Sequence, residues 1–140
     1  MLIDGNIILD VLQRREPHLK ASSAVWKICE TDQAEGFVSA LTFADLVYIM
    51  RKELTPDSIS EVLKKLMLIF RFSDLSVANI TKAAELQWKD FDDAVQAATA
   101  AQLRAQYIIT RNTKDYTQST VPAVTPDEFL ERFIGPPINS

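Results

Sequence analysis

Apolar and polar positions follow one another along the chain in short blocks that fit strands and helices in turn. Residues 2–4 (LID) are a brief apolar run that ends in a carboxylate, and residues 6–13 (NIILDVLQ) then carry apolar side chains on all sides. A short strand followed at once by a buried helix is typical of an α/β unit. We therefore expect a strand at 2–4 and a helix at 6–13.

The alternation continues to the end of the chain. A second helix is expected from Pro17, because proline suits the first turn of a helix, and Gly36 is expected to end it. Further strands are expected at 37–40, 69–72, 107–110 and 121–125. Further helices are expected at 41–52, from Thr55-Pro56, at about 76–88, after 90–93, and from Pro126 to a stop at Gly135-Pro136-Pro137.

Strands that alternate with single or paired helices predict a three-layer α/β/α fold of the Rossmann-like kind, with a mostly parallel central sheet. The length of 140 residues is near the commonest domain size, so a single domain spanning 1–140 is expected.

Composition narrows the class of protein. The net charge is −4, which does not fit a protein that grips nucleic acid through bulk positive charge. Cys29 is the one cysteine, so no intramolecular disulfide can form, and the start of the chain lacks the basic and apolar segments of a signal peptide. No apolar run reaches the length of a membrane span. We expect a soluble cytoplasmic protein with no membrane partner.

Residues 90–93 (DFDD) place three carboxylates just before an Ala-rich helical run. The plainest interpretation is capping, in which Asp90 is the N-cap and Asp92 and Asp93 favour the partial positive charge of the first turn.

Other acids point to a second interpretation of the same segment. Asp4 closes the first strand, Asn112 and Asp115 follow the strand at 107–110, and Asp93 begins a helix that leads into that strand. Asp45 lies among apolar neighbours, where a carboxylate usually has a partner. Sites in open α/β sheets form at the carboxyl ends of the strands, so these side chains are expected to converge. Converging carboxylates need shared protons or a cation.

The donor set favours a hard divalent cation, Mg²⁺ or Mn²⁺. His18 and Cys29 stand alone, which argues against zinc, and the chain has neither a Gly-rich phosphate loop nor a GxSxG motif. A carboxylate-held Mg²⁺ most often serves phosphate chemistry.

Three segments together resemble the PIN-domain nucleases, and within them the VapC-like toxins of toxin–antitoxin pairs. They are LIDGNIILDVL at 2–12, SALTFADLVYIMRK at 39–52 and DFDDAVQAATAAQLRAQYIITRNTKDY at 90–116. The resemblance spans nearly the whole chain, and its third segment is the most specific. It implies an Mg²⁺- or Mn²⁺-dependent endoribonuclease that hydrolyses RNA phosphodiester bonds.

The resemblance also assigns roles. Asp4, Asp45 and Asp93 match the family's metal-binding acids, although Asp45 stands where the family usually has Glu. Gly5 replaces a usual Ser or Thr. Asn112 stands where many relatives have Asp, and Asp115 is expected to supply that fourth catalytic charge.

Supporting roles follow from position. Asn6 matches the family's Asn and would orient Asp4 or bind a water, Asp90 would cap its helix or contact a metal-bound group, and Thr110 borders the site. Arg111 and Lys114 are candidate contacts for RNA phosphates.

The resemblance implies partners as well. A toxin of this family would bind a cognate antitoxin through a helical segment in a groove, for which Ile8, Val11, Leu12 and Trp26 are candidates that also suit core packing. Homodimerisation is implied by the resemblance alone.

Two alternatives remain open. Gly5, Asp45 and Asn112 would also suit a catalytically weakened PIN-fold module that binds RNA or protein. A phosphoryl-transfer receiver domain ranks last, because the chain lacks adjacent acids after the first strand and a lone phosphoacceptor Asp after a middle strand.

Overall fold

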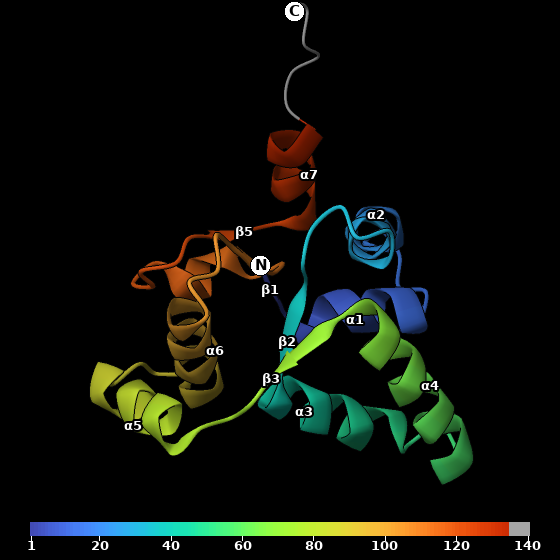
Figure 1. Cartoon of the computed structure of the whole chain (residues 1–140), viewed down its shortest axis with the longest axis horizontal. Helices are drawn as coiled ribbons and strands as arrows, with labels where there is room; N and C mark the ends of the chain where they lie inside the picture. The colour runs from blue at the N-terminus through green and yellow to red at the C-terminus, as the bar shows by residue number, and fades with distance from the viewer. Residues whose placement is uncertain (135–140) are drawn as a thin grey trace, which may run out of the picture.

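Residues 1–134 are described by a computed structural model, and they form a five-stranded sheet in the order β3-β2-β1-β4-β5 (Figure 1). Every strand pair is parallel, which agrees with the mostly parallel sheet expected. The predicted helix stop at Gly135-Pro136-Pro137 lies outside the described residues.

The elements alternate as expected. The strands are β1 (Leu2–Ile3), β2 (Phe37–Ser39), β3 (Arg71–Ser73), β4 (Ile108–Ile109) and β5 (Ala123–Val124). The helices are α1 (Gly5–Leu12), α2 (Leu19–Glu30), α3 (Ala40–Met50), α4 (Pro56–Ile69), α5 (Val77–Leu86), α6 (Phe91–Gln102), the 3-10 turn η1 (Thr113–Tyr116) and α7 (Pro126–Ile134).

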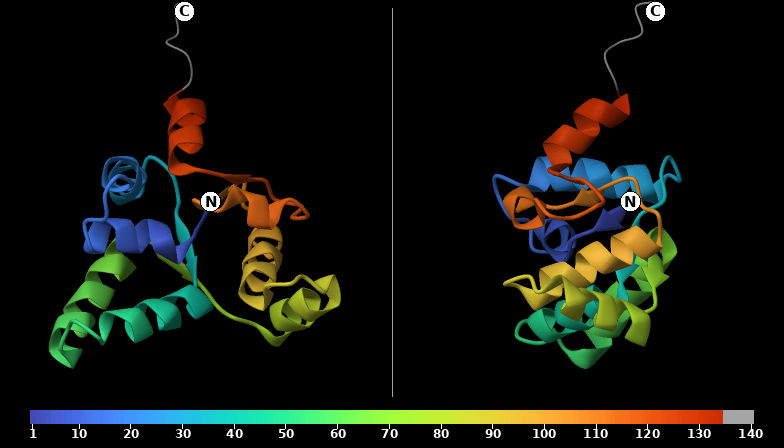
Figure 2. Two further views of the ribbon diagram at one scale, coloured as in Figure 1. Left: turned by 180° about the vertical axis from the view of Figure 1, so that it is seen from behind. Right: turned by 90° about the vertical axis from the view of Figure 1, so that its left-hand side faces the viewer.

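Helices cover both faces of the sheet. In Figure 1, α5 and α6 lie to one side of the strands and α1, α2 and α4 to the other, and the reverse view in Figure 2 keeps this grouping. The prediction of a three-layer α/β/α fold is confirmed. The central strands lie between the layers, so Leu2, Ile3, Ile108 and Ile109 are all 0% exposed. This explains why β1 and β4 are continuously apolar in sequence.

Three predicted boundaries were wrong, namely both ends of the second helix and the start of the strand predicted at 69–72. The second helix begins at Leu19 rather than at Pro17 and ends at Glu30, before Gly36. Gly36 is needed for a close approach instead, because a Cβ at this position would lie 2.6 Å from the buried Sγ of Cys29. The strand predicted at 69–72 begins at Arg71, since α4 keeps its helical hydrogen bonds to Ile69.

None of the helices within residues 1–134 is long and apolar enough to cross a membrane.

Candidate active site

The sheet order brings three carboxyl ends to one edge. β1 lies between β2 and β4, so the chain leaves β1 in one direction across the sheet and later returns to its other side. Asp4 follows β1, Ser39 ends β2 and Thr110 follows β4. A switch point of this kind opens a crevice at the carboxyl edge, and this is where α/β folds bind ligands.

The carboxylate of Asp4 is held in this crevice by Thr110, which follows β4. The Thr110 hydroxyl donates a 2.8 Å hydrogen bond to Asp4 Oδ2 and accepts one from the Asn112 N–H at 3.1 Å. Burial raises the pKa of the Asp4 carboxyl. The Thr110 hydrogen bond, the nearby N–H groups of Gly5 and Asn6, and the charge of Arg111 oppose that rise. The Asp4 side chain forms no N-cap hydrogen bond with the first turn of α1. Asp4 therefore has a fixed orientation and a cost of ionisation that is only partly offset.

Asp93 lies in the first turn of α6. Its own N–H donates to Asp90 Oδ1 at 3.1 Å, so Asp90 is the N-cap, as the capping interpretation predicted. Its carboxylate accepts a 3.1 Å hydrogen bond from the hydroxyl of Tyr116, a residue of η1 that is 4% exposed. The helix start and the turn after β4 thus aim one carboxylate together.

Burial and the neighbouring acids raise the pKa of Asp93. Its pKa rises from an ordinary 3.8 to about 6, first because of burial and then because of the negative charges of Asp90, Asp115 and Asp4, while the Tyr116 hydrogen bond opposes the rise. The acids come from β1, α6 and η1, so the expected convergence is present in the fold.

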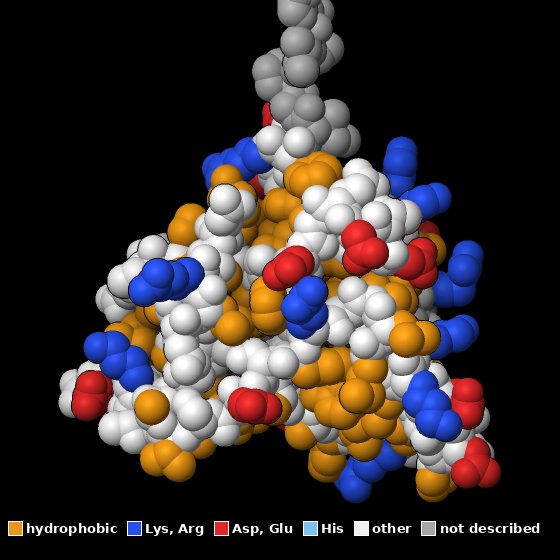
Figure 3. Space-filling view, in the orientation of Figure 1, with side chains coloured by type: hydrophobic (Ala, Val, Ile, Leu, Met, Phe, Trp, Pro, Cys, Tyr) orange, Lys and Arg blue, Asp and Glu red, His pale blue; other side chains and the backbone are white. Residues whose placement is uncertain are grey.

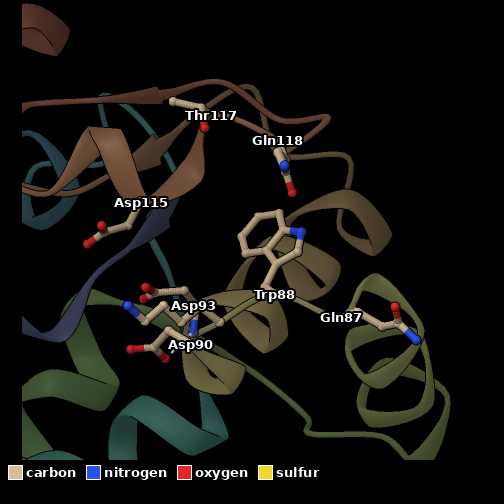
Figure 4. Close-up of a pocket in the computed structure, with 8 residues that line it drawn as sticks. Gln87, Trp88, Asp90, Asp93, Asp115, Thr117 and Gln118 are labelled. Atoms are coloured by element: carbon tan, nitrogen blue, oxygen red, sulfur yellow. Dashed lines mark hydrogen bonds between the residues drawn. The ribbon is translucent and has the colours of Figure 1, made fainter.

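A cavity of about 650 Å³ opens beside Asp93. Asp90, Asp93 and Asp115 line it together with Trp88, and Figure 4 shows their side chains around one opening. Asp115 therefore lies with Asp93. Asn112 is the exposed N-cap residue of η1, and it contributes its backbone N–H to Thr110.

Asp45 lies in a neighbouring hollow of about 140 Å³, lined also by Asp4, Gly5, Asn6 and Thr42. Asp45 has no protein partner among the described residues, and its expected role as a metal ligand stays a prediction. It is exposed, and no residue in the described part of the chain forms an ion pair or hydrogen bond with its carboxylate. The reason is helical periodicity, because Thr42, Leu46 and Met50 form the buried stripe of α3.

Although Asp45 is exposed, partial desolvation by the atoms around it raises the pKa of its carboxyl, and so does the charge of Asp92. Asp92 is exposed, yet it adds to the negative field of the site.

Gly5 and Asn6 lie beside Asp4 in this hollow. A Cβ at Gly5 would lie 3.1 Å from Thr42 Cγ2, so the Thr42 methyl fills the space that the usual Ser or Thr would need. Asn6 lines the same hollow as Asp4, but its side-chain oxygen accepts a hydrogen bond from Arg15 at 3.3 Å.

Arg111 is engaged inside the protein. Its NH2 donates to Asp10 Oδ1 at 3.1 Å, and its Nε lies 3.1 Å from Asp10 Oδ2 without being aligned for a hydrogen bond. Asp10 is 0% exposed and also accepts from Ser22 at 2.8 Å. This pair ties α1, α2 and the end of β4 together behind Asp4. Lys114 is exposed in η1 and remains a candidate phosphate contact.

A buried hydrogen bond fixes α3 against α6. Ser39 caps α3, and its hydroxyl lies 2.9 Å from Gln96 Oε1 and 3.1 Å from Thr42 Oγ1. Ser39 and Gln96 are 1% and 5% exposed. Since buried polar pairs resist rearrangement, this contact sets the separation of the helices that present Asp45 and Asp93.

The site's chemistry fits a divalent cation that prefers oxygen ligands. Its donors are carboxylates, and burial together with their mutual repulsion raises the pKa of Asp93. Within residues 1–134, no three His, Cys, Asp or Glu side chains are gathered closely enough to hold a metal as they stand.

Sequence reasoning missed two features. Tyr116 was not assigned a role, although it follows Asp115 directly. The Asp10–Arg111 pair was also missed, yet Asp10 interrupts the apolar run IILDVL, the same signal that was used for Asp45.

Known proteins provide an independent comparison. The family model described as PIN domain matches residues 1–114. Ribonuclease VapC1 of Aquifex aeolicus (strain VF5) is 24% identical over 138 residues, covering 95% of this chain and 94% of that protein.

Two solved structures share the fold. A toxin–antitoxin complex from Klebsiella pneumoniae superposes with a TM-score of 0.66 at 23% identity, covering 89% of this chain and 96% of that chain. VapBC2 from Rickettsia felis, bound to a DNA fragment from its promoter, superposes with a TM-score of 0.64 at 15% identity and the same coverage.

The family match covers most of the chain and contains Asp4, Asp45 and Asp93. The solved structures agree with it in the arrangement of strands and helices. This chain belongs to the PIN domain family.

Proposed function

We propose that the protein is a metal-dependent endoribonuclease and the toxin of a type II toxin–antitoxin pair, acting in the cytoplasm as a single domain. The observation that carries the proposal is the set of carboxylates around Asp93, whose pKa is raised to about 6 by burial and by the charges of Asp90, Asp115 and Asp4. Such repulsion calls for a bound cation. Family membership and the similarity to Ribonuclease VapC1 support RNA as the substrate.

Asp4, Asp45 and Asp93 would hold Mg²⁺ or Mn²⁺, and Asp115 would complete the acidic site. The metal, when bound, supplies polarisation of a phosphoryl oxygen and a water of lowered pKa. The chain's own residues position the ligands. Thr110 orients Asp4 and Tyr116 orients Asp93, each through a hydroxyl that donates to one carboxylate oxygen.

Lys114 is proposed to contact an RNA phosphate, because it is exposed on η1 close to Asp115. Arg111 is better suited to a positioning role, since its guanidinium is occupied by Asp10.

A cognate antitoxin and a homodimer are the proposed protein partners. Structural relatives described as toxin–antitoxin complexes support the antitoxin. Ile8 is 1% exposed and belongs to the core, whereas Val11, Leu12 and Trp26 are half-buried and remain candidates for the groove. Apolar surface over α3 and α4, where Tyr48, Met67 and Leu68 are exposed, supports a further protein contact (Figure 3).

The test is cleavage of structured and unstructured RNAs by the purified chain in Mn²⁺, in EDTA, and as Asp93→Asn. We expect cleavage in Mn²⁺ only, and we expect the variant to cleave no faster than the parent in EDTA. Absence of cleavage across the RNA panel, with the parent folded, would contradict the proposal.

One observation favours a second candidate, a weakened PIN-fold module that binds RNA or protein. The Thr42 methyl would lie only 3.1 Å from a Cβ at Gly5, so the usual Ser or Thr next to Asp4 would be crowded. Titration with Mn²⁺ separates the candidates, because a competent site is stabilised against unfolding by the ion and a degraded one is not.

A further inference from the structure

The cavity beside Asp93 has two chemically different sides. Its acidic side holds Asp93 and Asp115, and its other side holds the indole of Trp88 with the amides of Gln87 and Gln118. Figure 4 shows Trp88 between the acids and Gln87, with Gln118 above the indole. The acids belong to the proposed metal site, but the aromatic and amide side has no role in holding a metal.

Trp88 is connected to the acids through one neighbour. Its ring meets the Tyr116 ring edge-on, with centroids 6.2 Å apart and an angle of 74° between the planes, and the Tyr116 hydroxyl donates to Asp93. The indole is half-buried and packs against hydrophobic clusters that include Ala97 and Val95. The core thus holds the ring at a fixed place while the ring also lines the cavity.

The turn before Trp88 is backbone-strained. Gln87 has φ 55°, a left-handed conformation that favours glycine at the end of a helix, yet the chain retains a side chain there. That side chain is exposed and lines the cavity. Arg14, Asp32 and Arg104 also have a positive φ, so the conformation alone is not specific to the cavity. The relevant observation is that the Gln87 side chain lines the cavity wall.

These features match the needs of a nucleobase. Single-stranded RNA is recognised by bases that stack on aromatic rings and by hydrogen bonds to their edges. Gln87 and Gln118 each offer a donor and an acceptor, and the volume of about 650 Å³ lies within the usual range for small-molecule sites. Lys89 on the same wall provides one positive charge for the backbone.

We propose that Trp88 stacks a base of the nucleotide next to the scissile phosphate. This rests on the proposed function, since the acids define which phosphate is cut. Trp88 is a binding residue, and the amides of Gln87 and Gln118 contact the edge of the stacked base.

The experiment measures binding of a short single-stranded RNA by the full chain, with Ca²⁺ in place of Mg²⁺ and the RNA checked for intactness. The RNA is compared with versions that lack one base at successive positions, and the parent with Trp88→Leu. At one position, removal of the base weakens binding by the parent roughly 5-fold or more, because base–aromatic stacking contributes on that order. The same removal has little effect on Trp88→Leu.

Comparing the two losses isolates the contact even if Trp88→Leu lowers stability, because only the coupling between ring and base is counted. The chain's other tryptophan provides a matched control. Trp26 lies on α2 and packs edge-on against Phe70. Trp26→Leu should therefore leave the coupling between Trp88 and the base unchanged. Intrinsic fluorescence adds a direct signal, since RNA should quench the parent and Trp26→Leu but not Trp88→Leu.

Two results would overturn the inference. One is equal sensitivity of the parent and Trp88→Leu to every missing base. The other is quenching of Trp88 by oligoarginine and not by RNA, which would assign the cavity to a cationic partner segment. Both differ from failure of the proposed function, in which RNA couples to Trp88 but is not cleaved in Mn²⁺.

Discussion

The Thr110 hydroxyl donates to the carboxylate of Asp4 at 2.8 Å across 106 positions of sequence. The same oxygen accepts from the N–H of Asn112, so Asp4 is coupled to the first residues of the turn that presents Asp115 and Tyr116. The buried Thr110 hydroxyl therefore links Asp4, which follows β1, to the turn that follows β4.

Replacing Thr110 by Val, which is similar in shape, should weaken metal binding about 10- to 100-fold, as loss of a partner that orients a ligand usually does. It should also raise the pKa of Asp4 further, because the hydrogen bond from Thr110 opposes the effect of burial. Calorimetric titration with Mn²⁺ measures the affinity. Thr110→Ser keeps the hydroxyl and is the control, and equal affinities for Val and Ser would contradict this role.

Asp93→Asn should make the metal-free protein more stable at neutral pH. The pKa of Asp93 is raised from 3.8 to about 6 in the fold. Ionisation therefore costs the folded state stability, and the loss develops as pH rises from about 4 to about 6. Since Asp93 is partly solvated, we expect a gain of about 1 kcal/mol for the variant.

Urea unfolding in EDTA at several pH values measures this gain, which should vanish below about pH 4. Asp57→Asn is the matched control, because Asp57 also lies in the first turn of a helix but is exposed on α4. A comparable gain in both variants would mean that neither burial of Asp93 nor repulsion among the site's acids is the cause.

Arg111→Met should destabilise the fold by about 3–5 kcal/mol, because it leaves the fully buried carboxylate of Asp10 without its cation. Adding Asp10→Asn should restore most of the loss. Chemical denaturation measures both variants. If the double variant also binds RNA as the parent does, Arg111 acts within the fold and not on phosphate, whereas a cost under about 1 kcal/mol would show that the pair matters little.

Gly5→Ser should restore the usual side chain of the family at a cost that depends on Thr42. The new Cβ would lie 3.1 Å from Thr42 Cγ2. In a Thr42→Ser background that methyl is absent while a hydroxyl remains for Ser39, so Gly5→Ser should be tolerated better by about 0.5 kcal/mol or more. Thermal unfolding of the four proteins measures this coupling. Additive effects would show that the Thr42 methyl does not exclude a side chain at position 5.

Most of the fold follows from local pattern. The order of strands and helices, the N-caps at Thr55 and Asp90, and the edge that gathers Asp4, Asp93 and Asp115 were all predictable, because caps and apolar periods are local signals. Helix ends were less predictable. Gly36 resembled a helix stop, but its place is fixed by contact with Cys29, which no local pattern reveals.

The side-chain partners in the site were harder to predict than the elements. Asp45, an acid among apolar neighbours, was expected to have a partner, but it is exposed and no described protein group pairs with it. Asp10 has the same local pattern and pairs with Arg111. The difference lies in which face of each helix meets the sheet. That depends on packing between distant segments, as does the Tyr116 contact to Asp93.

The position of β4 in the sheet has a consequence for protein synthesis. β1 pairs with β4 as well as with β2, and the residues that hold Asp4 and Asp93, namely Thr110 and Tyr116, come after β4. A ribosome-bound chain that has exposed only its first hundred or so residues has all its metal-binding acids but cannot yet fix them. Synthesis of β4 and η1 therefore has to finish before the hydroxyls of Thr110 and Tyr116 can orient these two carboxylates.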